Sequence, residues 1–174
     1  MARKDGQYAQ FIPRQMWKAD PEFPKGMTPL KTPVENVVAA WTNTPPCSSP
    51  QECMTAVRMI QKKHVESGLP DIAHNFLIGG DGRIYEGRGW RHQGPVYPET
   101  VEDHERLNNN CVEIAFIDWA YDQKQTIFFE TMDVLVGQVQ EFGHITEAFS
   151  LYLSLRGDIV LFERYSKDKA KQVF

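Results

Sequence analysis

The sequence predicts an α/β domain in which a central mixed β-sheet is flanked by three helices. Short apolar runs that are typical of buried strands alternate along the chain with amphipathic helical patterns. No repeat or low-complexity tract interrupts this alternation. The chain has 174 residues, of which 41% are hydrophobic, and this is enough for one domain with its own core.

The N-terminal part of the chain differs in composition from the rest. Residues 1–33 are rich in proline and charge, so we expect an arm packed on the core, with Met16 and Trp17 as its anchors. The domain itself is expected over residues 34–174. It begins with the apolar run 34–41, which is bounded by prolines and by Thr-Asn-Thr and therefore predicts a buried strand.

A helix is predicted to begin near Pro50, because Ser49 is a suitable N-cap and proline is favoured in the first helical turn. Gly68 ends it. The inward face of this helix is expected to carry Cys53, Val57, Ile60 and His64, which recur at helical spacing.

The middle of the chain predicts a hairpin and a further strand. Residues 75–79 and 83–86 are extended patterns joined by the turn sequence Gly-Asp-Gly at 80–82. The apolar run 112–117 predicts another buried strand. Between them, residues 94–110 lack periodicity and predict a long loop, and loops of this length are usually functional or mobile.

Two more helices are predicted in the C-terminal part. The first carries four apolar residues at helical spacing and ends near Gly143. Its inward side chains are expected to be Phe129, Met132, Val136 and Val139. The second is predicted over residues 159–171, with Leu161 and Tyr165 pointing inward.

Charge and hydropathy exclude several functional classes. A net charge of −4 gives no electrostatic attraction to nucleic acid or to an anionic membrane. No apolar stretch approaches the roughly 20 residues that span a bilayer. Residues 1–6 lack the apolar region of a signal peptide, so we expect that any targeting segment of an extracellular protein would lie outside this sequence.

The three cysteines allow two interpretations. Cys47 and Cys53 lie six positions apart in a turn-rich loop, and this spacing fits either a small disulfide ring or two unrelated buried thiols. The absence of paired Cys-x-x-Cys motifs argues against a structural zinc site. Cys111 precedes an apolar run and is expected to be a buried free thiol.

Three segments carry a resemblance to a known family. Residues 56–64 (AVRMIQKKH) and 71–90 (DIAHNFLIGGDGRIYEGRGW) closely resemble the peptidoglycan recognition protein family, and residues 112–117 (VEIAFI) resemble its next strand. The resemblance covers about residues 34–150, whereas the last thirty or so match poorly. It places Cys47 and Cys53 where the family has its short disulfide.

This resemblance implies an amidase-like fold with a groove on one face of the sheet. Some members of the family are zinc enzymes that cut the bond between the lactyl group of muramic acid and the first alanine of the stem peptide. Other members have lost zinc and act as innate immune receptors, co-receptors or decoys. A hydrolytic zinc site needs three protein ligands and one open position for water.

The positions that the resemblance assigns to this chemistry are altered here. Ala40, Val96 and Leu155 stand at the three zinc-ligand positions and cannot coordinate a metal ion. His74 replaces the tyrosine that polarises the scissile carbonyl, and His92 lies four residues from the second ligand position. We therefore expect a protein that is not an enzyme and that uses no metal or other cofactor.

The resemblance also implies candidates for the groove that holds a peptide stem. Gly89-Trp90 matches a pattern linked to diaminopimelate-type stems, and Arg88 or Arg91 could pair with a carboxylate. The other interpretation makes Trp90 a core residue and leaves both arginines in solvent. The complete set of candidates is Trp41, Thr42, His74, Arg88, Gly89, Trp90 and Arg91.

The loop at 94–110 is about seven residues longer than the family spacing and contains several charges. We hypothesise that it narrows or covers the groove, so that the domain binds free muropeptide poorly.

Three functions follow from these expectations. The first is an extracellular receptor or co-receptor domain, as in insect-type membrane receptors, that pairs with another recognition domain through a peptidoglycan fragment. The second is a decoy or negative regulator, and the third is a residual metal-dependent amidase.

Overall fold

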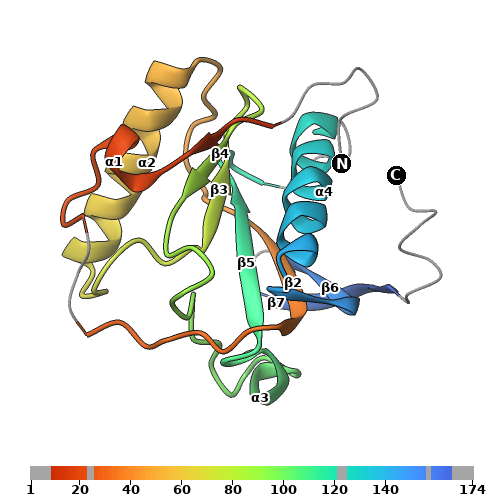
Figure 1. Ribbon diagram of the computed structural model, residues 1–174. Coiled ribbons are helices and arrows are strands. Elements are labelled where there is room, and N and C mark those ends of the chain that lie inside the picture. Colours follow the sequence, from red (N-terminus) through yellow and green to blue (C-terminus); the bar gives the residue numbers. More distant parts are fainter. Residues whose placement is uncertain (1–8, 23–25, 121–124, 156–157, 166–174) are drawn as a thin grey trace.

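The computed structural model describes residues 9–22, 26–120, 125–155 and 158–165. Within them, seven strands form one sheet in the order β1-β4-β3-β5-β2-β6-β7 (Figure 1). The strands are β1 (Phe11–Ile12), β2 (Val34–Trp41), β3 (Phe76–Ile78), β4 (Ile84–Glu86), β5 (Cys111–Phe116), β6 (Ile145–Leu155) and β7 (Asp158–Tyr165). The helices are α1 (Arg14–Trp17), α2 (Pro50–Glu66), α3 (His104–Leu107) and α4 (Thr126–Glu141).

The sheet is mixed, as predicted. β2 runs parallel to its neighbours β5 and β6, β3 is parallel to β5, and β1 is parallel to β4. The two antiparallel pairs are the hairpins β3–β4 and β6–β7. The predicted central sheet with flanking helices is confirmed. In the described residues, no helix is long and apolar enough to span a bilayer.

Most of the predicted elements match closely. β2 has the predicted limits, and the β3–β4 hairpin and β5 lie where the sequence indicated. Ser49 caps α2 through a capping box, in which its hydroxyl accepts the Glu52 N–H and the Glu52 carboxylate accepts the Ser49 N–H. Gly68 follows α2 with a φ of 98°, as expected for a residue that ends a helix.

α4 and α2 lie on opposite faces of the sheet (Figure 1). Alternation along β2 sends Val37 and Ala39 into the core beneath α4 and sends Val38 and Ala40 to the other face. The predicted inward residues of α4, Met132, Val136 and Val139, are buried there, and Phe129 packs at the margin.

The face opposite α4 has two covers. α2 and α1 cover β1, β4 and β3 and reach Ala40 of β2. Over the first residues of β5 and over β2 and β6, the cover is the 94–110 segment, which includes the single-turn helix α3. The predicted loop therefore contains a short helix and a small apolar cluster of its own.

The helix predicted over residues 159–171 is wrong. Residues 158–165 form β7, an antiparallel partner of β6, and residues 166–171 lie outside the described part of the chain. Ile159 and Leu161 alternate with more exposed neighbours, which is the period of a strand. Pairing with the 11-residue strand β6 satisfies the backbone of this segment and overrides its helical spacing.

The N-terminal arm is part of the sheet rather than only packed on it, because β1 adds a parallel strand beside β4. Trp17 is fully buried, as expected, and its indole N–H donates to the Glu86 carbonyl. Met16 is 54% exposed, so its prediction as an anchor is wrong. The arm is held by Arg14, whose guanidinium lies 2.9 Å from the buried Asp71 carboxylate.

Candidate functional site

The candidate site lies on the sheet face opposite α4, where β5 and β2 run side by side. Glu113 pairs in register with Val38, and Ala115 pairs with Ala40 two residues further along both strands. These four side chains share one face of the sheet. Glu113 is 4% exposed, so a carboxylate lies at the floor of this region beneath the 94–110 segment.

The Glu113 carboxylate has one partner from each of two segments. His74 Nδ1, which comes from the connection before β3, lies 2.5 Å from Oε1, and the Tyr97 hydroxyl donates to Oε2 at 2.6 Å. The backbone around it is also fixed, because the Glu113 N–H donates to Asn75 Oδ1 and the Asn75 N–H donates to the Glu113 carbonyl. A buried carboxylate needs such donors to offset its lost hydration.

A second histidine stands beside this pair. The His64 and His74 rings meet edge to face with centroids 5.4 Å apart, and His64 Nδ1 accepts the Ala73 N–H. Burial lowers the pKa of His64 to about 4, and the neighbouring His74 contributes to the shift. His64 is therefore neutral at pH 7 and acts as a hydrogen-bond acceptor from the loop that carries His74.

The 94–110 segment is held together by contacts between its side chains and its own backbone. Asn108 accepts the Tyr97 N–H and donates to the Tyr97 carbonyl, which closes the loop on itself. The Asn36 amide of β2 donates to the carbonyls of Arg106 and Asn110, which ties the end of the segment to the sheet. Val101 and Leu107 are buried against Val38 and Tyr152 in the same apolar cluster.

The three positions assigned to zinc ligands do not come together. Ala40 is buried on the face that carries Glu113, whereas Leu155 packs on the opposite face beneath α4. Val96 is 73% exposed on the loop. Among Ala40, Val96, Leu155 and His74, only Ala40 and His74 lie on the same face of the sheet. In the described residues, no three His, Cys, Asp or Glu side chains gather at a metal-binding geometry.

The predicted groove residues are also divided. Trp41 lies at the end of β2 on the α4 side, where its ring meets Phe116 edge to face and its N–H donates to Gln125. Thr42 follows, and its N–H donates to the Phe116 carbonyl. Among the candidates, His74 contacts the Glu113 carboxylate and Trp41 does not share its face.

Trp90 and Arg88 make contacts within the local fold. Trp90 packs against Phe11 and Phe76 and stacks on His144 with ring centroids 4.8 Å apart, so the structure places it in the margin of the α4-side core. The Arg88 guanidinium donates to the carbonyls of residues 72, 93 and 94 and joins two loops. Arg91 is exposed.

The cysteines follow the expectation that the resemblance gave. Cys47 and Cys53 form a disulfide that joins the loop before α2 to its first turn. Cys111 is a buried free thiol at the start of β5, and its Sγ lies 3.9 Å from the Tyr97 hydroxyl. Burial raises the pKa of Cys111 to about 12, and the nearby Glu113 carboxylate adds to the shift.

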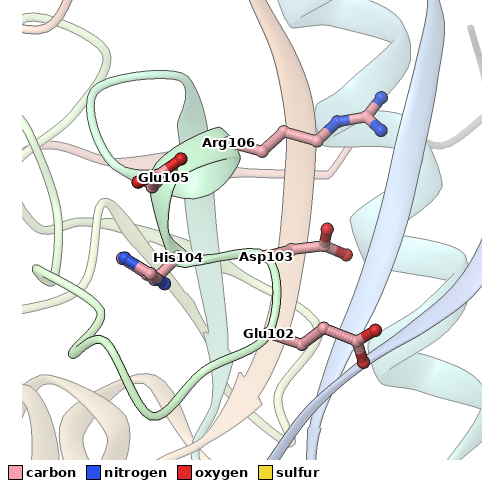
Figure 2. Close-up of a pocket in the computed structure, with 5 residues that line it drawn as sticks. All are labelled: Glu102, Asp103, His104, Glu105 and Arg106. Atoms are coloured by element: carbon pink, nitrogen blue, oxygen red, sulfur yellow. The ribbon is translucent and has the colours of Figure 1, made fainter.

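A shallow hollow of about 440 Å³ lies in the cover itself, lined by the consecutive residues 102–106. In Figure 2, Glu102, Asp103 and Arg106 extend to one side of this turn, whereas His104 and Glu105 extend to the other. Because these charged groups diverge, the hollow does not focus them on one ligand.

The sequence analysis did not identify Glu113 and Tyr97, whose hydrogen bond joins the 94–110 segment to the sheet. One signal was available, because Glu113 is the only charged residue within the apolar run 112–117. A carboxylate at the centre of a buried strand needs a hydrogen-bond or ion-pair partner. Tyr97 gave no such signal, because its partner is distant in sequence.

The chain resembles characterised proteins over most of its length. The pattern of the family described as N-acetylmuramoyl-L-alanine amidase (Amidase_2) matches residues 30–157. Peptidoglycan-recognition protein LC of Drosophila melanogaster is 44% identical over 104 residues, which are 59% of this chain and 20% of that protein. Peptidoglycan recognition protein 1 of Rattus norvegicus is 46% identical over 92 residues, or 49% of this chain and 49% of the relative. The match thus spans a fifth of the first protein and about half of the second.

Three solved structures share the fold. The ectodomain of the Drosophila transmembrane receptor PGRP-LCa has a TM-score of 0.72 and 31% identity, with 82% of this chain and 83% of that chain covered. PGRP-LE in complex with tracheal cytotoxin, a monomeric diaminopimelic acid-type peptidoglycan, has a TM-score of 0.71, 32% identity and coverage of 82% and 81%. The complex of the LCa and LCx ectodomains with tracheal cytotoxin has a TM-score of 0.69, 26% identity and coverage of 83% for both chains.

Proposed function

The chain belongs to the peptidoglycan recognition protein family, and we propose that it is a non-enzymatic recognition domain that assembles with a second domain of this family. In this proposal, the two domains hold a diaminopimelate-type peptidoglycan fragment between them. The assembly of the LCa and LCx ectodomains with tracheal cytotoxin is a solved example of such an arrangement.

The cover over the Glu113 region is the observation that carries the proposal. Tyr97, Val101 and Leu107 pack over Val38, Cys111 and Tyr152 on the sheet face that carries Glu113, and they bury this floor. A muropeptide could not reach this floor while the cover is in place. Binding through a partner that presents the fragment fits this geometry better than binding by the isolated domain.

The side chains available at the family's zinc positions support a role without hydrolysis. Ala40 has no donor atom in its side chain, and neither has Val96. His74, which stands at the position of the family's tyrosine, is engaged with Glu113.

An extracellular location forms part of the proposal. The Cys47–Cys53 disulfide suits an oxidising compartment. PGRP-LCa, with which the fold is shared, is a transmembrane receptor ectodomain.

Sedimentation velocity tests the assembly. This domain, the LCx ectodomain and tracheal cytotoxin are mixed, and each component is then omitted in turn. We expect a faster boundary only when all three are present. A complex that forms equally well without the fragment would favour a decoy that occupies the partner, and the absence of any complex would contradict the proposal.

A hydrolysis assay tests the non-enzymatic role. We expect no release of alanine-led peptides from peptidoglycan, with or without added zinc. Release of such peptides by material that carries stoichiometric zinc would establish the residual amidase instead.

A further inference from the structure

The 94–110 segment is held to the sheet by contacts of two different kinds. Its end is fixed by the Asn36 amide, which binds the carbonyls of Arg106 and Asn110, and by the fully buried Leu107. Its first part, residues 94–102, reaches the sheet through the buried Val101 and through Tyr97, whose hydroxyl donates to Glu113 Oε2 at 2.6 Å. The Asn108 side chain joins the two parts through its hydrogen bonds with the Tyr97 N–H and carbonyl, so an opening of the first part must break these bonds as well.

The Tyr97 hydroxyl is a permanent donor in this contact. Burial and the nearby Glu113 carboxylate raise the pKa of Tyr97 well above its ordinary value of 10, so the phenol stays protonated at physiological pH. Glu113 is buried and has His74 as its other side-chain partner. Loss of the hydroxyl would leave one carboxylate oxygen without its donor, and this penalty favours the closed position.

We propose that the Tyr97–Glu113 hydrogen bond is an autoinhibitory latch that keeps residues 94–102 closed over the sheet. When the latch opens, these residues swing away while the Asn36 and Leu107 contacts stay in place. Opening uncovers Glu113, Cys111 and the neighbouring surface of β2. The inhibitory role of the latch rests on the proposed function, whereas its opening is a property of the fold.

The chain contains a native reporter for this opening. Cys111 is its one free thiol, because the other two of its three cysteines form the disulfide. It lies directly beneath Tyr97 and is 5% exposed. A thiol reagent can modify Cys111 only when its cover is displaced, so the rate of labelling under native conditions measures opening.

The test compares two Tyr→Phe variants that lose the same kind of bond. Tyr97→Phe removes the latch hydroxyl and keeps the ring. Tyr85→Phe is the matched control, because the buried Tyr85 donates its hydroxyl to the Asp81 carboxylate at 2.7 Å on the half of the sheet that α2 covers. We expect Tyr97→Phe to label Cys111 about ten to a hundred times faster than the wild type, and Tyr85→Phe to label at the wild-type rate.

Three outcomes are possible, and each decides the question. Selective acceleration in Tyr97→Phe, with little dependence on added urea, supports local opening. Equal acceleration in both variants means that labelling follows global unfolding, which overturns the latch. An unchanged rate in Tyr97→Phe also overturns it.

Glu113→Gln gives a second variant in case Tyr97→Phe folds poorly. It keeps an acceptor for Tyr97 but removes the charge, so a smaller acceleration is expected. These results are separable from the proposed function. Failure of the labelling test removes the latch and leaves partner-dependent assembly intact. Failure of the sedimentation test removes the inhibitory role and leaves the local opening at Tyr97 intact.

Discussion

The two covers on the sheet face opposite α4 differ in what holds them in place. α2 is a 17-residue helix with a capping box at its start, a disulfide to the preceding loop and the buried side chains Val57 and Ile60 beneath it. The 94–110 segment has only the four-residue helix α3. Its attachment combines a few apolar contacts with the Tyr97–Glu113 hydrogen bond.

This difference separates stability from function. A long amphipathic helix buries apolar surface continuously, so its release unfolds the domain. A short loop with one polar contact at its centre can open at a lower free energy and leave the sheet intact. In the proposed function, the α2 side would stabilise the fold and the 94–110 side would control access to the sheet.

The largest effect is expected at the ion pair that secures the N-terminal arm on the α2 side. Asp71→Ala leaves the buried Arg14 guanidinium without its carboxylate, although backbone carbonyls still accept from it. We expect the free energy of unfolding to fall by about 3–5 kcal/mol, measured by urea denaturation. A loss below about 1 kcal/mol would show that the arm contributes little to the fold.

A pair of truncations compares the two covers directly. Ile60→Ala beneath α2 should lower the free energy of global unfolding by about 2–4 kcal/mol, because it leaves a cavity in the core between α2 and the sheet. Val101→Ala in the 94–110 segment should mainly speed amide hydrogen exchange of that segment, with a smaller global effect. Equal global losses would contradict the separation of the two covers.

Removal of the disulfide sharpens the comparison further. Replacing both Cys47 and Cys53 by serine should cost about 2 kcal/mol, since the small ring restricts the unfolded chain. Thermal denaturation measures this loss. Labelling of Cys111 under native conditions should stay at the wild-type rate, and faster labelling would indicate that the two covers are coupled.

A pH dependence is expected at the boundary between the two covers. The pKa of His64 is about 4 in the folded protein and 6.5 in an ordinary histidine, so the unfolded chain takes up a proton first as the pH falls. Stability contributed by His64 should therefore be lost between about pH 6.5 and pH 4. His64→Gln should reduce this loss of stability between pH 6.5 and pH 4. A His64 pKa near 6.5, measured by NMR titration, would contradict the argument that burial lowers it.

Local patterns in the sequence were sufficient for the regular elements. Ser49 and Pro50 marked the start of α2, and Gly80 to Gly82 marked the turn of the hairpin, because these signals act within a few residues. β7 was missed because its strand state depends on pairing with β6, and the apolar spacing of a short segment fits a helix as well as a strand.

The candidate site was harder to predict because its contacts join distant residues. His74 was identified through the family resemblance, but its partner Glu113 lies 39 positions away. Tyr97 and Glu113 are 16 positions apart and meet only after the loop folds over the sheet. Trp90 had two interpretations, as a groove residue or as a core residue, and its packing on Phe76 and His144 could not be foreseen because it depends on where β3 and the end of α4 are placed.

Calorimetric titration of the isolated domain with a diaminopimelate-type muropeptide tests the central claim most directly. If the 94–110 segment keeps the Glu113 face covered, the titration should give no binding heat at micromolar concentrations. Saturable binding with a Kd in the micromolar range or tighter would contradict the account, because it would show that the domain alone holds the ligand without a partner.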